Sequence, residues 1–306
     1  MTTDVFVAVV GSINADATYS VEQLPQPGET VLSTGRHDAP GGKGANQAVA
    51  LAALGVSAHM LGAVGNDDAG VRIVSHLESR GVHCGSIAAT DKVPTGSAVI
   101  LVSGSGENSI VVDAGANKSL ESKHVEKYFS ENSPAVVMAQ LEVPLAAVAK
   151  AAVLAPGTFI LNPAPMPAVS PELSALIQAC DILVPNRTEL ATLAGTSLPQ
   201  NISEVISAAK RLNFEGKLVV TLGSEGALVF PDGISGESVK VDAPKVAAID
   251  SSGAGDAFCA ALAAGLLHGK DLVGATKYAC EFASWTTTQI GAQVGEVGSD
   301  RRLVHS

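Results

Sequence analysis

The sequence predicts an α/β fold, with a doubly wound, mostly parallel sheet flanked by helices and a small β-sheet lid. First, short apolar runs such as Val5–Val10 are continuous rather than alternating, as in strands that are buried on both faces. Second, such runs alternate regularly with helical patterns after residue 130. Third, two segments near residues 16–36 and 95–113 break this rhythm with polar, β-like patterns.

The elements of the expected core follow one another along the chain, and glycines end several of them. The expected strands are Val5–Val10, Ala135–Ala139, Thr158–Leu161, Asp181–Val184 and Leu218–Leu222. The expected helices begin at Gly42 and continue along the chain as Asp68–Arg80, Leu145–Leu154, Pro171–Ala179, Thr188–Leu193, Ser203–Leu212, Gly253–His268 and Leu272–Ile290.

The two irregular segments predict the lid. Short β-like pieces occur at Ala17–Ser20 and Thr30–Ser33, and Ser97–Val102 with Ser109–Asp113 reads as a hairpin around a Gly-rich turn. Ordinary surface hairpins are the alternative, but a lid over the carboxyl ends of the strands would cover the place where α/β folds bind ligands. The expected division is therefore an α/β core of residues 1–14, 37–94 and 114–306 and a β lid of residues 15–36 and 95–113.

Composition limits the classes of function. The 306 residues are 46% apolar and carry a net charge of −11, which favours a large core and argues against nucleic acid or an anionic membrane as the main partner. The four cysteines are far apart and form no CxxC pair, so buried thiols in a reducing compartment are expected. No signal-peptide pattern follows the start Met1–Asp4, which predicts a cytoplasmic location.

The most informative stretch is Asp250–Phe258. A Gly-rich turn enters an apolar helix there, and Asp256 stands in the first turn of that helix. The unpaired N–H groups of a helix start favour a phosphate, and Asp256 would lie beside it, placed to take a proton from a hydroxyl. This combination suggests phosphoryl transfer to an alcohol. The alternative is a tightly packed turn in which the carboxylate only interacts with the helix dipole.

A second Gly-rich stretch, Gly41–Gln47, does not have the spacing of a Walker A loop. Lys43 and Asn46 are three residues apart at a helix start and share one face, while the glycines allow a small ligand close to the backbone. A plain helix cap is the alternative.

Asn14 and Asp16 follow the first strand and are two residues apart, so in an extended segment their side chains point to the same side. Both could then accept hydrogen bonds from sugar hydroxyls. An Asx turn is the alternative.

Further polar groups also follow strands. Glu142 follows one strand, and Asn186 and Glu189 follow another, either as a helix cap or as a pair that binds Mg²⁺-bound water near phosphates. The segment Thr221–Gly226 carries glycines that could pass beneath a nucleotide. All of these clusters fall at the carboxyl ends of strands, on one rim of the expected sheet.

Taken together, these residues resemble the ribokinase family of carbohydrate kinases, from Gly11 to Gln293. Two motifs are specific to it, Gly41–Ala48 and Asp250–Phe258. Four further segments are similar to ribokinases rather than to the wider family, which includes fructokinases and adenosine kinase: Gly11–Asp16, Pro27–Thr30, Pro185–Glu189 and Gly291–Gln293.

The resemblance implies ATP as phosphoryl donor, with Mg²⁺, and D-ribose as an acceptor that is phosphorylated at its 5-hydroxyl. It implies a homodimer formed through the lids.

The resemblance also assigns roles to residues of this sequence. Asp256 is the expected catalytic base, and the expected anion hole is formed by the amides of Gly253, Ala254 and Gly255. The expected sugar contacts are Asn14, Asp16, Gly42, Lys43, Asn46 and Glu142. The expected nucleotide contacts are Asn186, Glu189, Thr221, Gly223, Gly226 and Gly255. A monovalent cation, usually K⁺, is expected at Asp250, Ser252, Thr286, Gln289 and Gly291.

The sequence departs from the family pattern at three places. Val294 and Gly295 replace a Pro-Ser pair that often follows Gly-Ala-Gln, Ser251 replaces a threonine, and Cys280 stands near where some relatives have a histidine beside the adenine.

Two alternative functions remain at this point. One is a kinase of deoxyribose, fructose or a nucleoside such as adenosine, although Asp16 favours ribose. The other is a non-catalytic sugar sensor.

Overall fold

The structure is a computed structural model that describes residues 5–302. The start Met1–Asp4, on which the signal-peptide expectation rests, lies outside the described residues.

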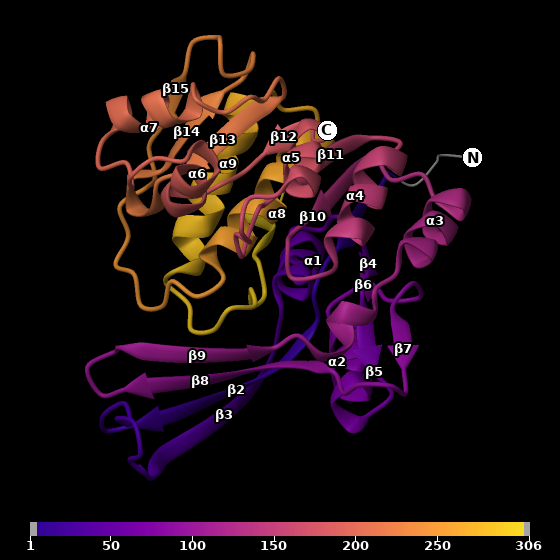
Figure 1. Cartoon of the computed structure of the whole chain (residues 1–306), viewed down its shortest axis with the longest axis vertical. Coiled ribbons are helices and arrows are strands. Elements are labelled where there is room, and N and C mark those ends of the chain that lie inside the picture. The colour runs from indigo at the N-terminus through magenta and orange to yellow at the C-terminus, as the bar shows by residue number, and fades with distance from the viewer. Residues whose placement is uncertain (1–4, 303–306) are drawn as a thin grey trace.

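Within residues 5–302, a nine-stranded sheet forms the centre of the molecule (Figure 1). In spatial order its strands are β15 (Val239–Val241), β14 (Ala227–Phe230), β13 (Lys217–Thr221), β12 (Ile182–Leu183), β11 (Thr158–Leu161), β10 (Val136–Ala139), β1 (Val7–Val10), β4 (Ala58–Leu61) and β6 (Val82–His83).

The sheet is parallel from β13 to β6, and only β14 and β15 run antiparallel to their neighbours. Both of its faces are buried. Val7 and Val9 of β1 belong to one hydrophobic cluster and Ala8 and Val10 to the other, because successive side chains of a strand point to opposite faces. This arrangement confirms the doubly wound, mostly parallel sheet.

Helices pack on each face. The first cluster includes residues of α1 (Lys43–Ala53), α2 (Asp68–Ser79), α8 (Ala254–Leu267) and α9 (Leu272–Thr286). The second includes residues of α3 (Ser122–Glu131), α4 (Leu145–Leu154), α5 (Pro171–Gln178), α6 (Arg187–Ala194) and α7 (Ile202–Ala209). Most expected core helices are therefore confirmed within a few residues, whereas the sequence pattern missed α3.

A second sheet projects from the main body (Figure 1). Its strands, in spatial order, are β3 (Ser33–Gly41), β2 (Asn14–Val21), β8 (Gly96–Ser103) and β9 (Asn108–Asp113). The expected hairpin is confirmed, since β8 and β9 pair antiparallel from Ser97 and Asp113 onward. A short parallel pair, β5 (Ala63–Gly65) and β7 (Ala88–Thr90), forms a separate two-stranded sheet.

The prediction of a strand at Thr30–Ser33 is wrong. The partner of β2 is β3, which runs from Ser33 to Gly41 and therefore crosses the expected boundary between lid and core at residue 36. Most of β3 is exposed and polar, so its sequence has no apolar alternation to reveal it. Its backbone pairs with β2 along the length of that strand, and this tertiary contact determines the strand.

The last long helix ends earlier than expected, at Thr286 rather than Ile290. Three successive threonines end it, because the hydroxyls of Thr286, Thr287 and Thr288 each donate to a backbone carbonyl three residues earlier. The carbonyl oxygen of Thr287 accepts from the backbone N–H groups of Ile249 and Asp250 instead of continuing the helix.

Candidate active site

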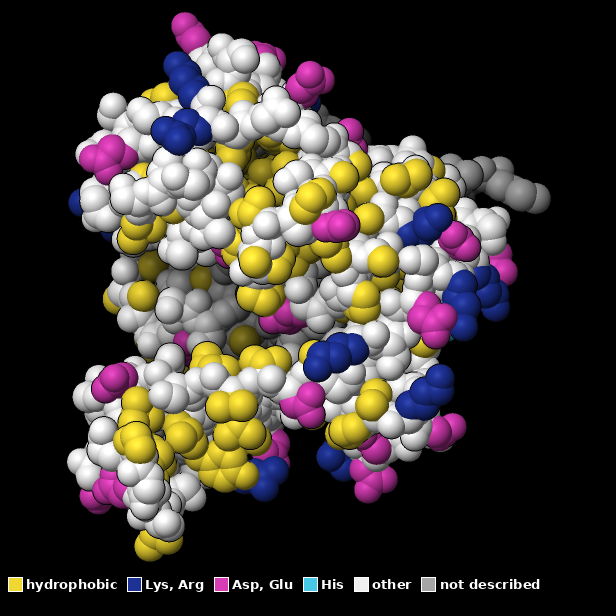
Figure 2. Space-filling view, in the orientation of Figure 1, with side chains coloured by type: hydrophobic (Ala, Val, Ile, Leu, Met, Phe, Trp, Pro, Cys, Tyr) yellow, Lys and Arg dark blue, Asp and Glu magenta, His cyan; other side chains and the backbone are white. Residues whose placement is uncertain are grey.

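A cavity of about 130 Å³ lies where the carboxyl ends of β11, β12 and β13 face the start of α8. It brings together seven of the residues singled out from the sequence: Lys43, Asn186, Glu189, Thr221, Gly253, Gly255 and Asp256. Asn162, Ala164, Val184 and Cys259 complete its lining, and sequence reasoning gave none of them a role in the site. In the space-filling view, the surface is hollowed between the main body and the projecting sheet (Figure 2).

The Asp256 carboxylate lies in the first turn of α8 and is only 6% exposed. Both of its oxygens accept hydrogen bonds from side-chain amides, Oδ2 from Asn46 Nδ2 and Oδ1 from Gln47 Nε2, each at 3.1 Å. Burial raises the pKa of Asp256, while the charge of Lys43 and the two amide hydrogen bonds oppose that rise. The site therefore contains a buried carboxylate with a raised pKa, a property suited to proton transfer.

The helix start beside Asp256 is open to an anion. Gly253 is the N-cap residue with φ 71°, and no side chain among residues 5–302 caps this helix. One of the three expected anion-hole amides is already used, because the N–H of Ala254 donates to the carbonyl of Ser251 at 3.2 Å. Gly253 and Gly255 both line the cavity, so the positive end of the helix dipole faces it.

Lys43 supplies the positive charge in the cavity. Burial lowers its pKa, but the carboxylates of Asp256, Glu142 and Glu189 more than compensate, and the pKa is raised. The side chain is therefore a cation at neutral pH. A cation beside an uncapped helix start is an arrangement that stabilises phosphate oxygens.

The expected sugar contacts Asn14, Asp16, Gly42, Asn46 and Glu142 are not in the lining of this cavity. Two of them are connected to it, since Asn46 donates to Asp256 and Glu142 Oε2 accepts from the backbone N–H of Lys43 at 3.1 Å. Glu142 also accepts from the hydroxyl of Ser12. Gly42 adopts φ 90°, and a Cβ there would lie 2.8 Å from the carbonyl oxygen of Ser12, so only glycine fits this close approach.

Asp16 and Asn14 lie on β2, where it leaves the core. Asp16 Oδ1 accepts from the backbone N–H of Ala98 on β8 at 3.0 Å. Burial raises the pKa of Asp16 to about 6, with a contribution from the charge of Glu142 and against the effect of that hydrogen bond. Asn14 Oδ1 accepts from Asn117 Nδ2 at 2.7 Å, and Asn117 also bonds the backbone of Ile13. Sequence reasoning gave Asn117 no role in the site, since a single Asn in a short 3₁₀ helix (Gly115–Ser119) carries no signal of its contacts.

On the opposite side of the cavity, the expected helix cap is formed. Asn186 Oδ1 accepts from the N–H of Glu189, and Glu189 Oε2 accepts from the N–H of Asn186, each at 2.8 Å. Both residues also line the cavity, so the cap does not exclude a role toward phosphates. Burial raises the pKa of Glu189, opposed by its hydrogen bond from Asn186 and by the charge of Lys43.

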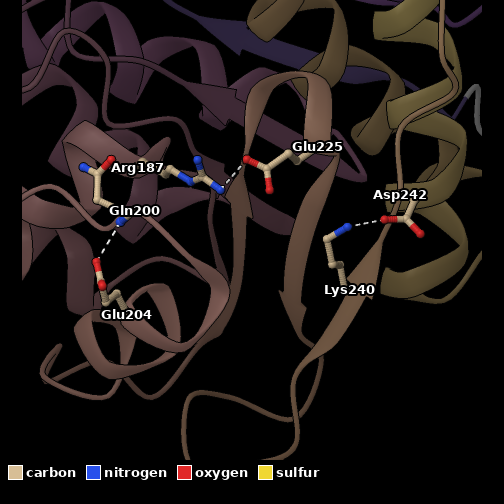
Figure 3. Close-up of polar contacts among 6 residues, drawn as sticks. All are labelled: Arg187, Gln200, Glu204, Glu225, Lys240 and Asp242. Atoms are coloured by element: carbon tan, nitrogen blue, oxygen red, sulfur yellow. Dashed lines mark hydrogen bonds and ion pairs between the residues drawn. The ribbon is translucent and has the colours of Figure 1, made fainter.

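The expected nucleotide loop is joined to this helix start. Arg187 Nη2 contacts Glu225 Oε1 at 2.8 Å, and the two side chains point toward one another (Figure 3). A parallel β-bridge between Asn186 and Thr221 connects the same two segments. Gly223 and Gly226 follow Thr221 with positive φ, but they do not line the cavity.

The residues expected to bind a monovalent cation occupy the turn before α8 and the segment that runs from the last residue of α9, Thr286, to Gly291. The carboxylate of Asp250 accepts from the N–H of Ser252 at 2.8 Å and from the N–H of Gly291 at 2.9 Å. These hydrogen bonds lower the pKa of Asp250, although partial burial acts in the opposite direction. Asp250 therefore stays ionised and connects the two segments that contain the expected cation ligands.

The sequence signature of the pfkB family carbohydrate kinases matches residues 5–297. The chain belongs to this family. The pfkB family relatives include a ribokinase from Schizosaccharomyces pombe, with 35% identity over 94% of this chain and 93% of that protein. A deoxyribokinase from Salmonella typhi has 34% identity over 94% of each chain. A solved structure of Arabidopsis thaliana ribokinase, complexed with ribose and ATP, superposes with a TM-score of 0.84 at 30% identity over 95% of each chain.

Two glycines at the start of α8 provide a matched test of the helix start. A Cβ at Gly253 would lie 2.1 Å from the carbonyl oxygen of Ala292, and φ there is +71°, whereas nothing lies within 4 Å of a Cβ at Gly255. We expect Gly253→Ala to lower the free energy of unfolding by at least ~1–2 kcal/mol. Gly255→Ala should leave it unchanged or raise it by up to about 1 kcal/mol. Chemical unfolding measures both, and equal effects would contradict the strained turn.

Proposed function

We propose that this protein phosphorylates D-ribose at O5, with ATP as the donor, to give D-ribose 5-phosphate. The observation that supports this most is the buried Asp256 carboxylate at an uncapped helix start, in one cavity with Lys43. A base, a cation and a phosphate-binding helix end are what phosphoryl transfer to an alcohol requires. Relatives that are named ribokinase, at 33–36% identity, support ribose as the acceptor.

In the proposed mechanism, Asn14, Asp16, Asn46 and Glu142 bind the sugar hydroxyls. Asp256 accepts the proton of the 5-hydroxyl as that oxygen attacks the γ-phosphorus and ADP leaves. The N–H groups of Gly253 and Gly255 and the Lys43 ammonium stabilise the charge on the transferred phosphoryl group. The projecting sheet, as a lid, would exclude water, which is a competing acceptor.

Mg²⁺ is expected to arrive with ATP. The oxygen-rich pair Asn186 and Glu189 suits the water shell of this ion, which prefers oxygen ligands and keeps several waters. When bound, Mg²⁺ neutralises charge on the phosphates. Thr221, Gly223 and Gly226 are proposed to contact the nucleotide, in a loop that the Arg187–Glu225 ion pair joins to the start of α6.

An ATP-dependent assay with D-ribose, followed by identification of the phosphorylated carbon, tests the proposal. Deoxyribose is the second candidate acceptor, because the 34% identity of a deoxyribokinase falls within the 33–36% range of the ribokinases. Fructose and adenosine complete the panel of acceptors. Binding of ribose without ATP-dependent turnover would instead indicate a sugar sensor and overturn the proposal.

Removal of the base tests the mechanism. We expect Asp256→Asn to lower kcat by about 10²–10⁴-fold, the usual contribution of a general base, while ribose still binds. The control is Asp271→Asn, which changes a carboxylate that caps α9 and retains capping capacity as Asn. Steady-state kinetics and calorimetry of ribose binding measure both effects. Near-normal turnover of Asp256→Asn would remove this residue from the role.

Sugar affinity should depend on pH through Asp16. Its carboxyl pKa is raised to about 6, so the acceptor form is lost as the pH falls through that value. We expect the affinity for ribose, measured by calorimetry without ATP, to increase as the pH rises through about 6 and then to level off. In Asp16→Asn this dependence should disappear and affinity should be low throughout. An affinity that is constant across this range in the unaltered protein would exclude the assignment.

We also propose a monovalent cation site at Asp250 and the backbone oxygens of Ser252, Thr286, Gln289 and Gly291. Carboxylate and carbonyl oxygens are the donors that a hard cation prefers, and Asp250 stays ionised between these segments. K⁺ bound there would order the turn before α8. Initial rates are therefore expected to be higher in K⁺ than in Na⁺ buffer at equal ionic strength, and equal rates would contradict the site.

The projecting sheet is proposed as the interface of a homodimer. On β9, Ile110 and Val112 are each 55% exposed and share a face with Ile100 of β8, and hydrophobic side chains gather on this sheet in Figure 2. A second copy would cover such a patch. Analytical ultracentrifugation should give twice the chain mass, and Ile110→Asp should give the monomer. The control Val153→Asp, on α4, should stay dimeric, and a monomeric unaltered protein would refute the interface.

A cytoplasmic location is part of the proposal. The cysteines Cys84, Cys180, Cys259 and Cys280 are buried and free, as is typical of proteins in a reducing compartment. Among the helices of residues 5–302, none combines the length and apolar character needed to cross a membrane.

A further inference from the structure

Three buried side chains form a continuous chain of hydrogen bonds that ends at Asp256. Gln140 Nε2, just after β10, donates to Gln47 Oε1 at 2.6 Å, and Gln47 Nε2, on α1, donates to Asp256 Oδ1 at 3.1 Å. Gln140 and Gln47 are fully buried, and Asp256 is 6% exposed. Neither glutamine lines the cavity, so neither is in a position to contact a substrate there.

The order of donors and acceptors gives this chain a fixed direction. A glutamine amide has an oxygen that accepts and a nitrogen that donates. Because Gln140 donates to the oxygen of Gln47, the nitrogen of Gln47 faces the carboxylate. If the Gln47 amide turned over, its oxygen would face the Asp256 oxygen and its nitrogen would face the Gln140 nitrogen. Both contacts would then be repulsive.

Packing fixes Gln140 in turn. A Cβ at Gly11 would lie 2.1 Å from Gln140 Oε1, so the absence of a side chain at this position is what makes room for the amide. Among the described residues, Gln140 Oε1 has no hydrogen-bond partner although it is buried. A buried acceptor without a donor costs stability, and an apolar side chain would avoid this cost. Core packing alone therefore does not account for a glutamine here.

We propose that Gln47 is a positioning residue for the Asp256 carboxylate and that Gln140 fixes the orientation of Gln47. This inference rests on the proposed function of Asp256 as the base. The relay, defined as Gln140, Gln47 and Asp256, presents N–H groups to one carboxylate oxygen while Asn46 does so to the other. It thereby stabilises the ionised form of a carboxylate that burial would otherwise protonate.

Other charged and titratable groups also face Asp256. Lys43 on α1 favours its ionised form, whereas Glu142 after β10 disfavours it. The buried Cys259 lies one helical turn further along α8, and Glu189 on α6 lines the same cavity. Gln47 differs from these groups because it binds the carboxylate directly and carries no charge of its own. Its effect can therefore be removed without a change in net charge.

The test replaces the amides by methionine, which has similar length and no N–H donor. We expect Gln47→Met to lower kcat by about ten- to a hundredfold, as for the loss of one hydrogen bond to a charged group, and to move the acidic limb of the kcat–pH profile to higher pH. The KM values for sugar and ATP should change little. Gln140→Met should also lower kcat and move the acidic limb to higher pH, but by smaller amounts. Gln47 keeps its N–H donor in this variant and loses only its fixed orientation.

A control separates positioning from general loss of packing. Asn132→Leu removes an amide that donates to the backbone of Tyr128 at the end of α3, away from the relay, and should leave kcat and the pH profile unchanged. Gln47→Met combined with Asp256→Asn should be no slower than Asp256→Asn alone, because the relay acts through that carboxylate. Additive losses in this double variant would overturn the proposal.

A second measurement needs no substrate, so it stands even if D-ribose is not the acceptor. The ¹³C carboxyl resonance of Asp256, identified by its absence in Asp256→Asn, reports its titration directly. In Gln47→Met this titration should move to higher pH while the protein remains folded by circular dichroism. An unmoved titration, whether or not activity falls, would show that Gln47 only fills space and would overturn the relay.

Discussion

A carboxylate that is removed from water needs hydrogen-bond donors or a positive charge, and the centre of this structure meets that requirement for Asp256. Asn46 and Gln47 bind its two oxygens, and Lys43 lies in the same cavity. The carboxylate stays buried beside an uncapped helix start, where the dipole favours anions. A phosphate that enters this place meets a base, a cation and backbone N–H groups together. Lys43, Asn46 and Gln47 therefore all act on one buried, ionisable group.

The arrangement requires segments far apart in the chain to approach closely. Asn46 and Asp256 are separated by 210 positions, and the start of α1 is bonded to the chain after β1, where the N–H of Ala45 donates to the carbonyl of Ser12 at 2.9 Å. A Cβ at Gly44 would lie 2.7 Å from the carbonyl carbon of Gly11, so both glycines allow this contact. The same approach places Glu142 against the N–H of Lys43. Small residues at the rim of the sheet thus position the polar groups of the site.

The two sheets divide the remaining tasks. The nine-stranded sheet, counted within residues 5–302, places the cavity at the carboxyl ends of its strands, the usual position for ligands in α/β folds. The projecting sheet begins at Asn14, so the proposed sugar contacts Asn14 and Asp16 belong to it rather than to the core. A movement of this sheet relative to the core would carry these acceptors toward or away from Asp256. In the proposed mechanism, sugar binding and exclusion of water would therefore be coupled through β2.

Local pattern alone determined the fold class and the two Gly-rich motifs, because apolar periodicity and the conformational freedom of glycine depend on neighbouring residues in the chain. Pattern also located Asp256 and Lys43. It did not reveal β3, whose pairing with β2 is a long-range contact, nor the early end of α9, where a carbonyl of Thr287 bonds to the segment before α8. The direction of the Gln140 and Gln47 amides was decided only by tertiary structure. A glutamine in a sequence can donate or accept, and only the partners that folding brings within about 3 Å select one orientation.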